Sequence, residues 1–421
     1  MPSPISDFPP AGTRGAVARR PPGLLGFLAL LFTLLGVSWA VVGTFTAPVI
    51  PGGWFTVLAA ACVVTALPFT AFIVSRARGI YPGKWFRLTI FRFLWYSHFL
   101  LLLAMLAGIA GAAAGVLGAL AGLGWETIGE WGRLVMGFAS ALFAVGMVAG
   151  YWGSRQLVVT ALDVHHPELP DALDGLVIAQ LSDVHVGPHT RASWLKGIAD
   201  AVHAARPELI AVTGDLVDDF DEDVTHYARG LGHLAAPLGV FVIPGNHDIY
   251  ANWPKVRDRL RTLPLRVLVN EHVIITRGSG SLALAGTGDP AAGRGAGSAL
   301  GAPDIAATLG GVPEGMFTLA LAHNPVLWPA LAARAVHLTL SGHTHWGQLA
   351  IPALHWCLAS PFLAHAMGWH ARGRSLLYIH PGTTWWGIPF RLGTPPEVAV
   401  LTLRVGPAPA ITQTAQRQVA C

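Results

Sequence analysis

The chain has 421 residues, of which 53% are hydrophobic and only 12% are charged. Soluble domains carry about 25% charged residues, so this composition argues against an entirely soluble protein and predicts that part of the chain lies in lipid. Three cysteines without a Cys-x-x-Cys pair exclude a disulfide framework and a cysteine zinc site. The net charge of +4 does not by itself indicate nucleic acid, and we expect no nucleic-acid partner.

The first 155 residues contain four apolar runs, each long enough for the roughly 20 helical residues that cross a bilayer. They extend over 23–47, 54–75, 94–122 and 132–153. The third run is rich in glycine and alanine, which favours close helix packing. The middles of the runs carry almost no ionisable side chains, so they predict an anchor or a docking platform and not a transport path. The alternative is a set of four buried helices in a soluble protein.

Basic residues flank these runs on one side of the predicted bundle. They precede the first run, separate the second from the third and follow the fourth: Arg14, Arg19, Arg20, Arg76, Arg78, Lys84, Arg87, Arg92 and Arg155. By the positive-inside rule, both ends of the bundle face the cytoplasm. We therefore expect a multi-pass protein of a bacterial-type cell inner membrane, with the lipid bilayer as its partner. Residues 1–22 would form a cytoplasmic N-terminal tail, and residues 23–155 a four-helix transmembrane region.

From about residue 157 onward, short apolar runs alternate with amphipathic stretches, which is the pattern of an α/β domain. Helices are expected at 191–205 and 222–236. Strands are expected over 176–183, 208–215 and 239–248, and near 266–276, 281–286, 317–322, 336–341, 376–380 and 397–404. This pattern predicts one cytoplasmic domain over 156–406, followed by a flexible tail at 407–421.

Five of the expected strands end in Asp, Asn or His. Their ends read LSDVH, VTGD, IPGNHD, LALAHNP and LSGHTH. Because sites in open α/β sheets gather outside the carboxyl ends of the strands, these five ends should converge. The polar residues that they contribute are Asp183, His185, Asp215, Asn246, His247, Asp248, His323, His343 and His345.

The residue types and spacing of these ends suit metal ligands. Asp183 and His185 are two residues apart, as are His343 and His345, so an extended backbone would point each pair to one side. Carboxylates, imidazoles and one amide favour Mn, Fe or Zn over Ca. The set is large enough for two divalent ions, and Asp215 is the natural bridge between them. Three glycines precede ligand-type residues where the chain must turn tightly: Gly214, Gly245 and Gly342.

The ordered set Asp-x-His, Gly-Asp, Gly-Asn-His-Asp, His and Gly-His-x-His resembles the calcineurin-like metallophosphoesterase superfamily over residues 176–404. The resemblance implies an α/β fold, a metallophosphatase-type two-sheet β-sandwich flanked by helices, here preceded by an α-helical transmembrane region. It implies that one metal ion is held by Asp183, His185, Asp215 and His345, and another by Asp215, Asn246, His323 and His343. It further implies that His247 is the catalytic histidine and that Asp248 is its orienting carboxylate.

Two bound cations would make a water molecule nucleophilic at neutral pH and would neutralise phosphoryl oxygens. His247 could then protonate the leaving oxygen. We expect a metal-dependent phosphoesterase that cleaves a phosphodiester or pyrophosphate bond. One alternative is a tethered phosphatase or cyclic nucleotide phosphodiesterase that acts on soluble substrates. Another is a non-catalytic membrane scaffold that keeps a metal site for its structure.

A tryptophan-rich, apolar segment follows the last histidine pair. It reads WGQLAIPALHWCLASPFLAHAMGW at 346–369 and is joined by WWGIPF at 385–390. Since tryptophan favours the membrane interface, the segment could form a lip on the bilayer, pack under the sheet, or line an acyl-chain pocket. SGHTHWGQ and the late YIHPGTTWWGIPFRLGTPPEVAVLTL also resemble a membrane-associated branch of the superfamily that includes UDP-2,3-diacylglucosamine pyrophosphohydrolases. This resemblance implies that the protein binds a phosphate-containing substrate, and that the substrate is lipid-linked if it lies in the membrane.

Overall fold

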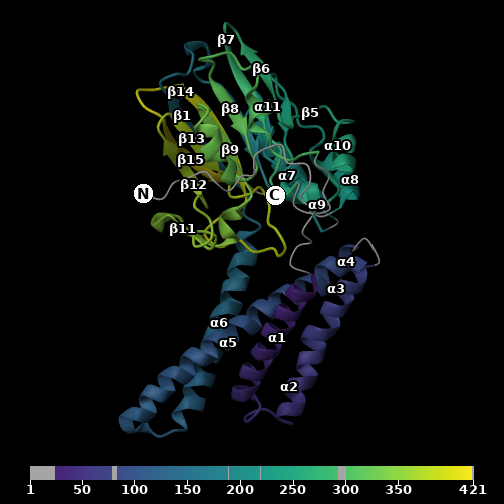
Figure 1. The fold of residues 1–421 in the computed structure, drawn as a ribbon, viewed down its shortest axis with the longest axis vertical. Helices are drawn as coiled ribbons and strands as arrows, with labels where there is room; N and C mark the ends of the chain where they lie inside the picture. Colours follow the sequence, from purple (N-terminus) through teal and green to yellow (C-terminus); the bar gives the residue numbers. More distant parts are fainter. Residues whose placement is uncertain (1–23, 78–82, 188, 219, 293–299, 420–421) are drawn as a thin grey trace, which may run out of the picture.

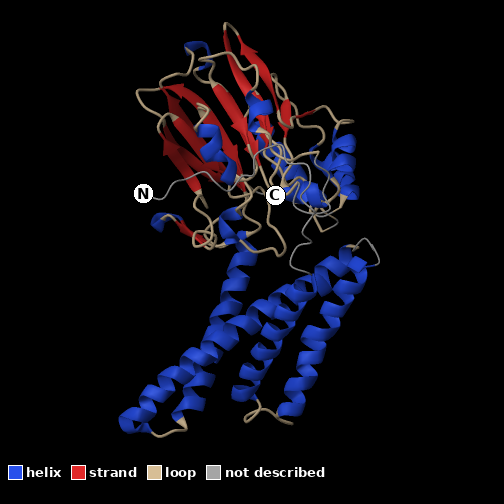
Figure 2. Ribbon diagram, viewed as in Figure 1, coloured by secondary structure: helices blue, strands red, loops and turns tan. Residues whose placement is uncertain are grey.

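The computed structural model describes residues 24–77, 83–187, 189–218, 220–292 and 300–419, so the tail expected at 1–22 lies outside the described residues. The described chain has two parts, a bundle of long helices and an α/β domain beyond one end of that bundle (Figure 1). The strands are confined to the α/β domain (Figure 2). This arrangement confirms the expected fold class.

Four long helices form the bundle, and the prediction of four helical runs is confirmed. They are α1 (Leu24–Thr46); α2 (Trp54–Ala61) continued by η1 (Cys62–Ala66) and α3 (Leu67–Ala77); α4 (Lys84–Phe86) continued by η2 (Arg87–Phe91), α5 (Arg92–Gly118) and η3 (Ala119–Leu123); and α6 (Thr127–Gly153). All four are long and apolar enough to cross a membrane. The third is longer than predicted, because the basic stretch 84–92 continues it as helix.

The closest helix pair in the bundle is α5 with α6. A methyl group at Gly111 would collide with the backbone of Trp131, and one at Gly115 would collide with the backbone of Thr127 and Ile128. The hydroxyl of Thr127 donates a hydrogen bond to the carbonyl of Gly115 at 3.0 Å. Small residues therefore let the two helix backbones meet, as the glycine- and alanine-rich run predicts.

The α/β domain contains two facing mixed sheets and a small hairpin. The first sheet has the order β15 (Ala410–Gln418), β1 (Val158–His166), β14 (Glu397–Val405), β2 (Val177–Leu181), β3 (Leu209–Val212), β4 (Val240–Val242) and β5 (Arg266–Val267). The second has the order β12 (Gly368–Arg372), β13 (Ser375–Ile379), β9 (Leu338–Ser341), β8 (Thr318–Leu321), β7 (Gly280–Gly286) and β6 (Glu271–Arg277). The hairpin pairs β10 (Ala350–Ile351) with β11 (Trp356–Cys357).

Alternating side chains fill the space between the sheets and the space outside them. In β3, Leu209 and Ala211 enter the core between the sheets, whereas Ile210 and Val212 pack beneath the outer helices. Those helices are α7 (Ala192–Ala204), α8 (Val224–Leu231) and α10 (Trp253–Leu260). The short α11 (Ile305–Leu309) and α12 (Trp328–Ala332) pack on the outer face of the second sheet. Because both faces of the central strands are buried, these strands are apolar runs that the sequence reveals.

The first sheet departs from the sequence prediction at one edge. The expected flexible tail at 407–421 is wrong for Ala410–Gln418, which forms β15 and pairs antiparallel with β1. Only Ile411 of this strand is buried, so its sequence lacks the apolar alternation by which strands are recognised. The strand forms because β1 has an edge with which it can pair, so its presence depends on tertiary structure and not on local sequence.

The α/β domain is joined to the bundle by direct packing as well as by the chain. A methyl group at Gly150 in α6 would collide with the ring of Phe390. The backbone N–H of Arg391 donates to the carbonyl of Gly150 at 2.8 Å. The guanidinium of Arg87 in η2 forms ion pairs with Asp218 at 2.6 Å and Asp223 at 3.5 Å. The segments around Asp218 and Arg391, which lie next to the predicted site, therefore contact the ends of the long helices.

Candidate metal centre

The predicted site residues lie at the carboxyl ends of five central strands. Strands β2, β3 and β4 are parallel neighbours in the first sheet, and β8 and β9 are parallel neighbours in the second. Their ends therefore meet at one edge of the sandwich. The structure brings together there Asp183, His185, Asp215, Asn246, His247, Asp248, His323, His343 and His345.

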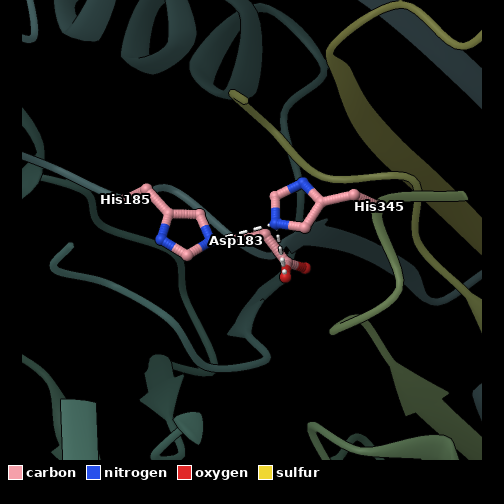
Figure 3. A group of neighbouring side chains, drawn as sticks. All are labelled: Asp183, His185 and His345. Carbon is pink, nitrogen blue, oxygen red and sulfur yellow. Dashed lines mark hydrogen bonds and ion pairs between the residues drawn. The ribbon is translucent and has the colours of Figure 1, made fainter. Parts of the chain in front are cut away.

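One group of donors contains Asp183, His185 and His345, all buried. Figure 3 shows the two imidazoles facing each other, with the carboxylate beside His345. The Nε2 atoms of His185 and His345 are 2.9 Å apart, and Nε2 of His345 lies 3.3 Å from Oδ1 of Asp183. One carboxylate and two imidazoles thus surround a volume small enough for a single metal ion.

Asp215 connects this group to the remaining donors. Its Oδ2 lies 3.6 Å from Nε2 of His185 and 3.2 Å from Nε2 of His323. Its Oδ1 accepts a hydrogen bond from the backbone N–H of His247 at 2.8 Å. The Asp215 carboxylate therefore lies between the two halves of the site, where a bridging ligand is expected.

Asn246 and His343 complete the second half of the site. The side-chain oxygen of Asn246 lies 2.7 Å from Nδ1 of His343 and 3.2 Å from Nε2 of His323. Donors that share an ion at about 2.0–2.1 Å lie roughly 3.0–3.4 Å from one another. The separations around Asp215 and Asn246 are close to this range, so the residues fit divalent metal ions.

Burial keeps several of these imidazoles neutral, which is the form that binds a metal. Burial and the charge of His247 lower the pKa of His185 well below its ordinary value. Burial and the neighbouring Arg391 do the same to the pKa of His345. Burial and the charge of His323 lower the pKa of His343 to about 4. At neutral pH these three ligands need not lose a proton to bind an ion.

The acidic groups and His323 behave differently. Burial raises the pKa of Asp183 to about 6. Burial opposes the ionisation of Asp215, but the charges of His323 and His247 outweigh it and hold the pKa of Asp215 well below its ordinary value. Burial likewise opposes the charge on His323, but the Asp215 carboxylate raises the pKa of His323 well above its ordinary value. Asp215 and His323 are therefore an ion pair at the centre of the site.

The backbone at the site is left-handed, and the expectation of extended Asp-x-His and His-x-His pairs is wrong. Five residues have positive φ angles of 43–71°: Asp183, His185, Asp215, His343 and His345. Such conformations cost about 1–3 kcal/mol each for residues with a side chain and persist where the surroundings fix them. Here the backbone N–H of Asp183 donates to the backbone carbonyl of Gly214, and that of His185 donates to the backbone carbonyl of Asp215, both at 3.0 Å. The ligands converge through tight turns at the strand ends.

All three of the predicted glycines are required by close approach, and a methyl group at Gly214 would collide with His323 and with the backbone of Gly245. A methyl group at Gly342 would collide with Ser182 and Asp183, and one at Gly245 would collide with Asp215. The turn after β9 therefore lies directly against the first ligand, and the turn after β4 against the central one.

His247 and Asp248 lie beside the donors, at the start of the short helix α9 (Asn246–Tyr250). Nδ1 of His247 lies 2.5 Å from the carbonyl oxygen of Asp218. The carboxylate of Asp248 accepts hydrogen bonds from the N–H groups of Leu216, Val217 and Gly245 at 2.9–3.3 Å. Asp248 therefore holds together the turns that carry Asp215 and His247, and its hydrogen bonds go to backbone groups.

The site also contains residues whose role was not predicted from the sequence. Arg391 is buried, and its guanidinium lies 2.8 Å from Nδ1 of His345 and donates to the carbonyl of His345 at 3.0 Å. Asp218 meets both His247 and Arg87. Arg391 lies in the late stretch that resembles the membrane-associated branch, but it is 46 residues from its histidine, so only the fold reveals that the two side chains meet.

Comparisons with known proteins agree with the geometry. The family model described as Calcineurin-like phosphoesterase matches residues 176–347. An uncharacterised metallophosphoesterase of Helicobacter pylori is 32% identical over 64% of this chain and 70% of its own length. Its counterpart in another strain is 34% identical, over 55% of this chain and 61% of that protein. A Bos taurus protein named "Transmembrane protein with metallophosphoesterase domain" is 31% identical, over 59% of this chain and 57% of that protein.

The fold and the site define the class of the protein as a two-sheet α/β domain with a candidate metal centre at its strand ends. The chain belongs to the calcineurin-like metallophosphoesterase family, as the sequence motifs predict. It spans about three fifths of the length of two of the relatives just described.

Proposed function

We propose that this protein is a membrane-anchored dinuclear-metal hydrolase that cleaves a phosphodiester or pyrophosphate bond in a lipid-linked substrate. The observation that carries the proposal is the position of Asp215. Donor atoms from neighbouring strand ends lie 3.2 and 3.6 Å from its carboxylate, and Asn246 extends the cluster at 2.7 Å from His343.

The two halves of the cluster would each hold one divalent ion, Mn, Fe or Zn. The first ion would be held by Asp183, His185, Asp215 and His345, and the second by Asp215, Asn246, His323 and His343. When bound, such ions supply an activated water and polarise the phosphoryl oxygens. Arg391 would act as a positioning residue, because it fixes the ring of His345.

His247 would deliver a proton to the leaving oxygen. Its Nδ1 is held by the carbonyl of Asp218, so its Nε2 is the nitrogen left to carry that proton. The side chain is only partly buried, so a substrate can reach it. Asp248 would keep this ring in place by fixing the turns on either side of it.

The tryptophan-rich segment supports a lipid-linked substrate. The segment around β11 lies on the side of the domain where α6 enters (Figure 1). Several of its apolar side chains are exposed, among them Leu354 at 70% and Phe362 at 82%. The ring of Trp386 lies 5.7 Å from that of His247 and 6.2 Å from that of Trp95 in α5. Apolar surface therefore extends from the helix bundle to the candidate general acid, as a lip for a bilayer substrate requires.

The basic residues at the helix ends next to the domain support a cytoplasmic orientation in an inner membrane. An even number of crossings would place the start of α1 on the same side as the α/β domain.

The first test is hydrolysis of bis-p-nitrophenyl phosphate by detergent-purified, full-length protein after chelation, with and without added Mn²⁺. We expect turnover only with the metal. Asp215→Asn should reduce turnover about 100-fold or more, because it removes the charge shared by both halves of the site. Asp258→Asn, on the exposed face of α10, is the matched control and should keep full activity. Turnover by Asp215→Asn equal to that of the wild type would exclude this cluster as the catalytic centre, and no Mn²⁺-dependent turnover by the folded wild-type protein would favour the scaffold alternative.

The second test addresses the lip. Combined Leu354→Ser and Phe362→Ser substitutions should slow hydrolysis of phosphodiester lipids in vesicles about tenfold, because they remove apolar surface from the membrane interface. Hydrolysis of the soluble diester should not change. Ile274→Ser, on the far edge strand β6 and 44% exposed, is the control. Unchanged hydrolysis of the vesicle lipids would favour a tethered enzyme with soluble substrates.

A further inference from the structure

A cavity lined by basic and aromatic side chains lies where the third and fourth long helices meet the α/β domain. Its volume is about 440 Å³, and its wall comes from residues 84–92, 151–155, 189–194 and 384–389. Four cationic side chains line it, namely Lys84, Arg92, Arg155 and Arg191. The lining contains none of the metal-centre residues, so the cavity is a separate site.

Among the described residues, no carboxylate neutralises the positive charge in this cavity. No carboxylate lines it, and within the described ranges none forms an ion pair with any of the four cations. Arg155 and Arg191 are close enough to repel Arg92. A few residues away, Arg87 is paired with the partly buried Asp218 and the buried Asp223, so the fold supplies carboxylates where it needs them. The cavity therefore needs an anion from outside the chain.

Aromatic rings hold two of the guanidinium groups in place. Arg92 lies over the ring of Trp385 at 5.2 Å, and Arg155 over the ring of Tyr151 at 4.2 Å. Stacking orients an arginine while leaving most of its N–H groups free, and a phosphate is the anion that matches this fork. The cavity is thus arranged for a phosphate group.

The position of the cavity specifies where that phosphate comes from. Lys84 begins the third candidate span, and Arg155 follows the end of the fourth by two residues, so both lie at head-group depth. Trp85 and Trp152 beside them are 76% and 61% exposed, as apolar side chains that face lipid are. Basic pockets between helix ends are suited to anionic head groups.

We propose that this cavity binds the phosphate of an anionic phospholipid and so clamps the α/β domain to the helix ends. The inference rests on the membrane placement in the proposed function and adds to it a lipid that is bound outside the metal centre. The clamp would reach the metal centre through Thr384, which lines the cavity and whose hydroxyl donates to the carbonyl of Val184 at 2.8 Å. A bound lipid would thereby steady the turn that carries Asp183.

The test measures lipid binding to full-length protein in detergent by native mass spectrometry, with EDTA present so that no lipid is hydrolysed. The probes are dioctanoyl phosphatidylglycerol, dioctanoyl phosphatidylcholine and inorganic phosphate. We expect phosphatidylglycerol to bind at least tenfold more tightly than either of the others. Combined Arg92→Gln and Arg155→Gln substitutions should weaken its binding at least tenfold. Combined Arg266→Gln and Arg334→Gln, two exposed arginines of the α/β domain that do not line the cavity, are the matched control and should leave it unchanged.

Arg191→Gln keeps the test decisive if substitutions in the helices impair folding, because Arg191 is exposed and lies outside them. It should weaken phosphatidylglycerol binding about threefold or more. Unchanged binding in Arg191→Gln and in the double variant would overturn the proposal, as would equal binding of phosphatidylcholine. Equal binding of inorganic phosphate would overturn the lipid assignment. Because binding is measured without metal, failure here is distinct from failure of Mn²⁺-dependent turnover in the wild-type protein.

Discussion

At the scale of single residues, protons compete with metal ions for two of the donors. Burial raises the pKa of the Asp183 carboxyl to about 6, so it takes up a proton in mildly acidic solution. His323, whose pKa is raised by Asp215, carries a proton at neutral pH. Both protons must leave before an ion can bind, whereas His185, His343 and His345 are already neutral.

We therefore predict that the affinity for Mn²⁺ falls as the pH is lowered through 6. Above pH 6 Asp183 is ionised and only His323 must release a proton, whereas below pH 6 Asp183 must release one as well. Calorimetric titration in buffers of different ionisation enthalpy should show about one additional proton released per protein at pH 5 compared with pH 7.5. The same proton count at both values would contradict the pKa of Asp183 derived from its burial.

The residues with motif partners were predictable, and those without were not. Asp183, His185 and His345 carry their signal in short spacings, and the structure brings them together. Arg391 and Asp218 act on ligands that are remote in sequence, so their roles depend on tertiary contacts that spacing does not encode. Backbone handedness at the ligands was missed for a similar reason, since an Asp-x-His pair fits an extended strand as well as a tight turn.

At the scale of elements, α5 and α6 pack through glycine. Gly115 lies against the backbone of Thr127 and Ile128, and no side chain fits between them. Apolar run length and glycine content made these helices predictable, because membrane helices obey simple rules of length and composition. The edge strand β15 obeyed no such rule, because seven of its nine residues are exposed and its pairing depends on β1.

Gly115→Leu should separate α5 from α6 and destabilise the bundle by about 1–3 kcal/mol, the usual cost of overpacking. Thermal unfolding in detergent, followed by circular dichroism, measures the effect as a lower melting temperature. Gly137→Leu in α6 is the control, since a side chain at that position meets open space. Equal losses for both variants would show that this crossing does not depend on the glycine.

At the scale of the whole molecule, the helix bundle contributes directly to the surroundings of the metal centre. Arg87 is 93% buried at its side chain and joins Asp218 and Asp223 at the base of the domain. The carbonyl of Asp218 in turn holds the ring of His247. The bundle and the candidate general acid are thus connected through two residues.

Arg87→Gln should lower turnover of the soluble diester by roughly 10- to 100-fold, the range seen when a group that orients a site residue is lost. Mn²⁺ affinity should change much less, because Arg87, within the described chain, forms no ion pair with a metal donor. Its connection to the donors is indirect and runs through Asp218. Turnover and calorimetric metal binding of the same preparation separate the two effects. Lys255→Gln, which removes an exposed lysine that pairs with Asp221 at 3.9 Å, is the control. Full activity in Arg87→Gln would show that the domain keeps its geometry without this contact.

The placement of β1 has a consequence for biosynthesis. This strand leaves the ribosome directly after α6, yet its neighbours β14 and β15 come much later, and its Thr160 bonds to Glu397, 237 residues further along. At about 5–20 residues per second, translation leaves β1 without either partner for roughly 12–50 seconds. During that interval the bundle can already be inserted while an unpaired strand waits beside the membrane surface. The nascent chain is therefore most exposed to aggregation, and most dependent on chaperones, while the sandwich is being synthesised.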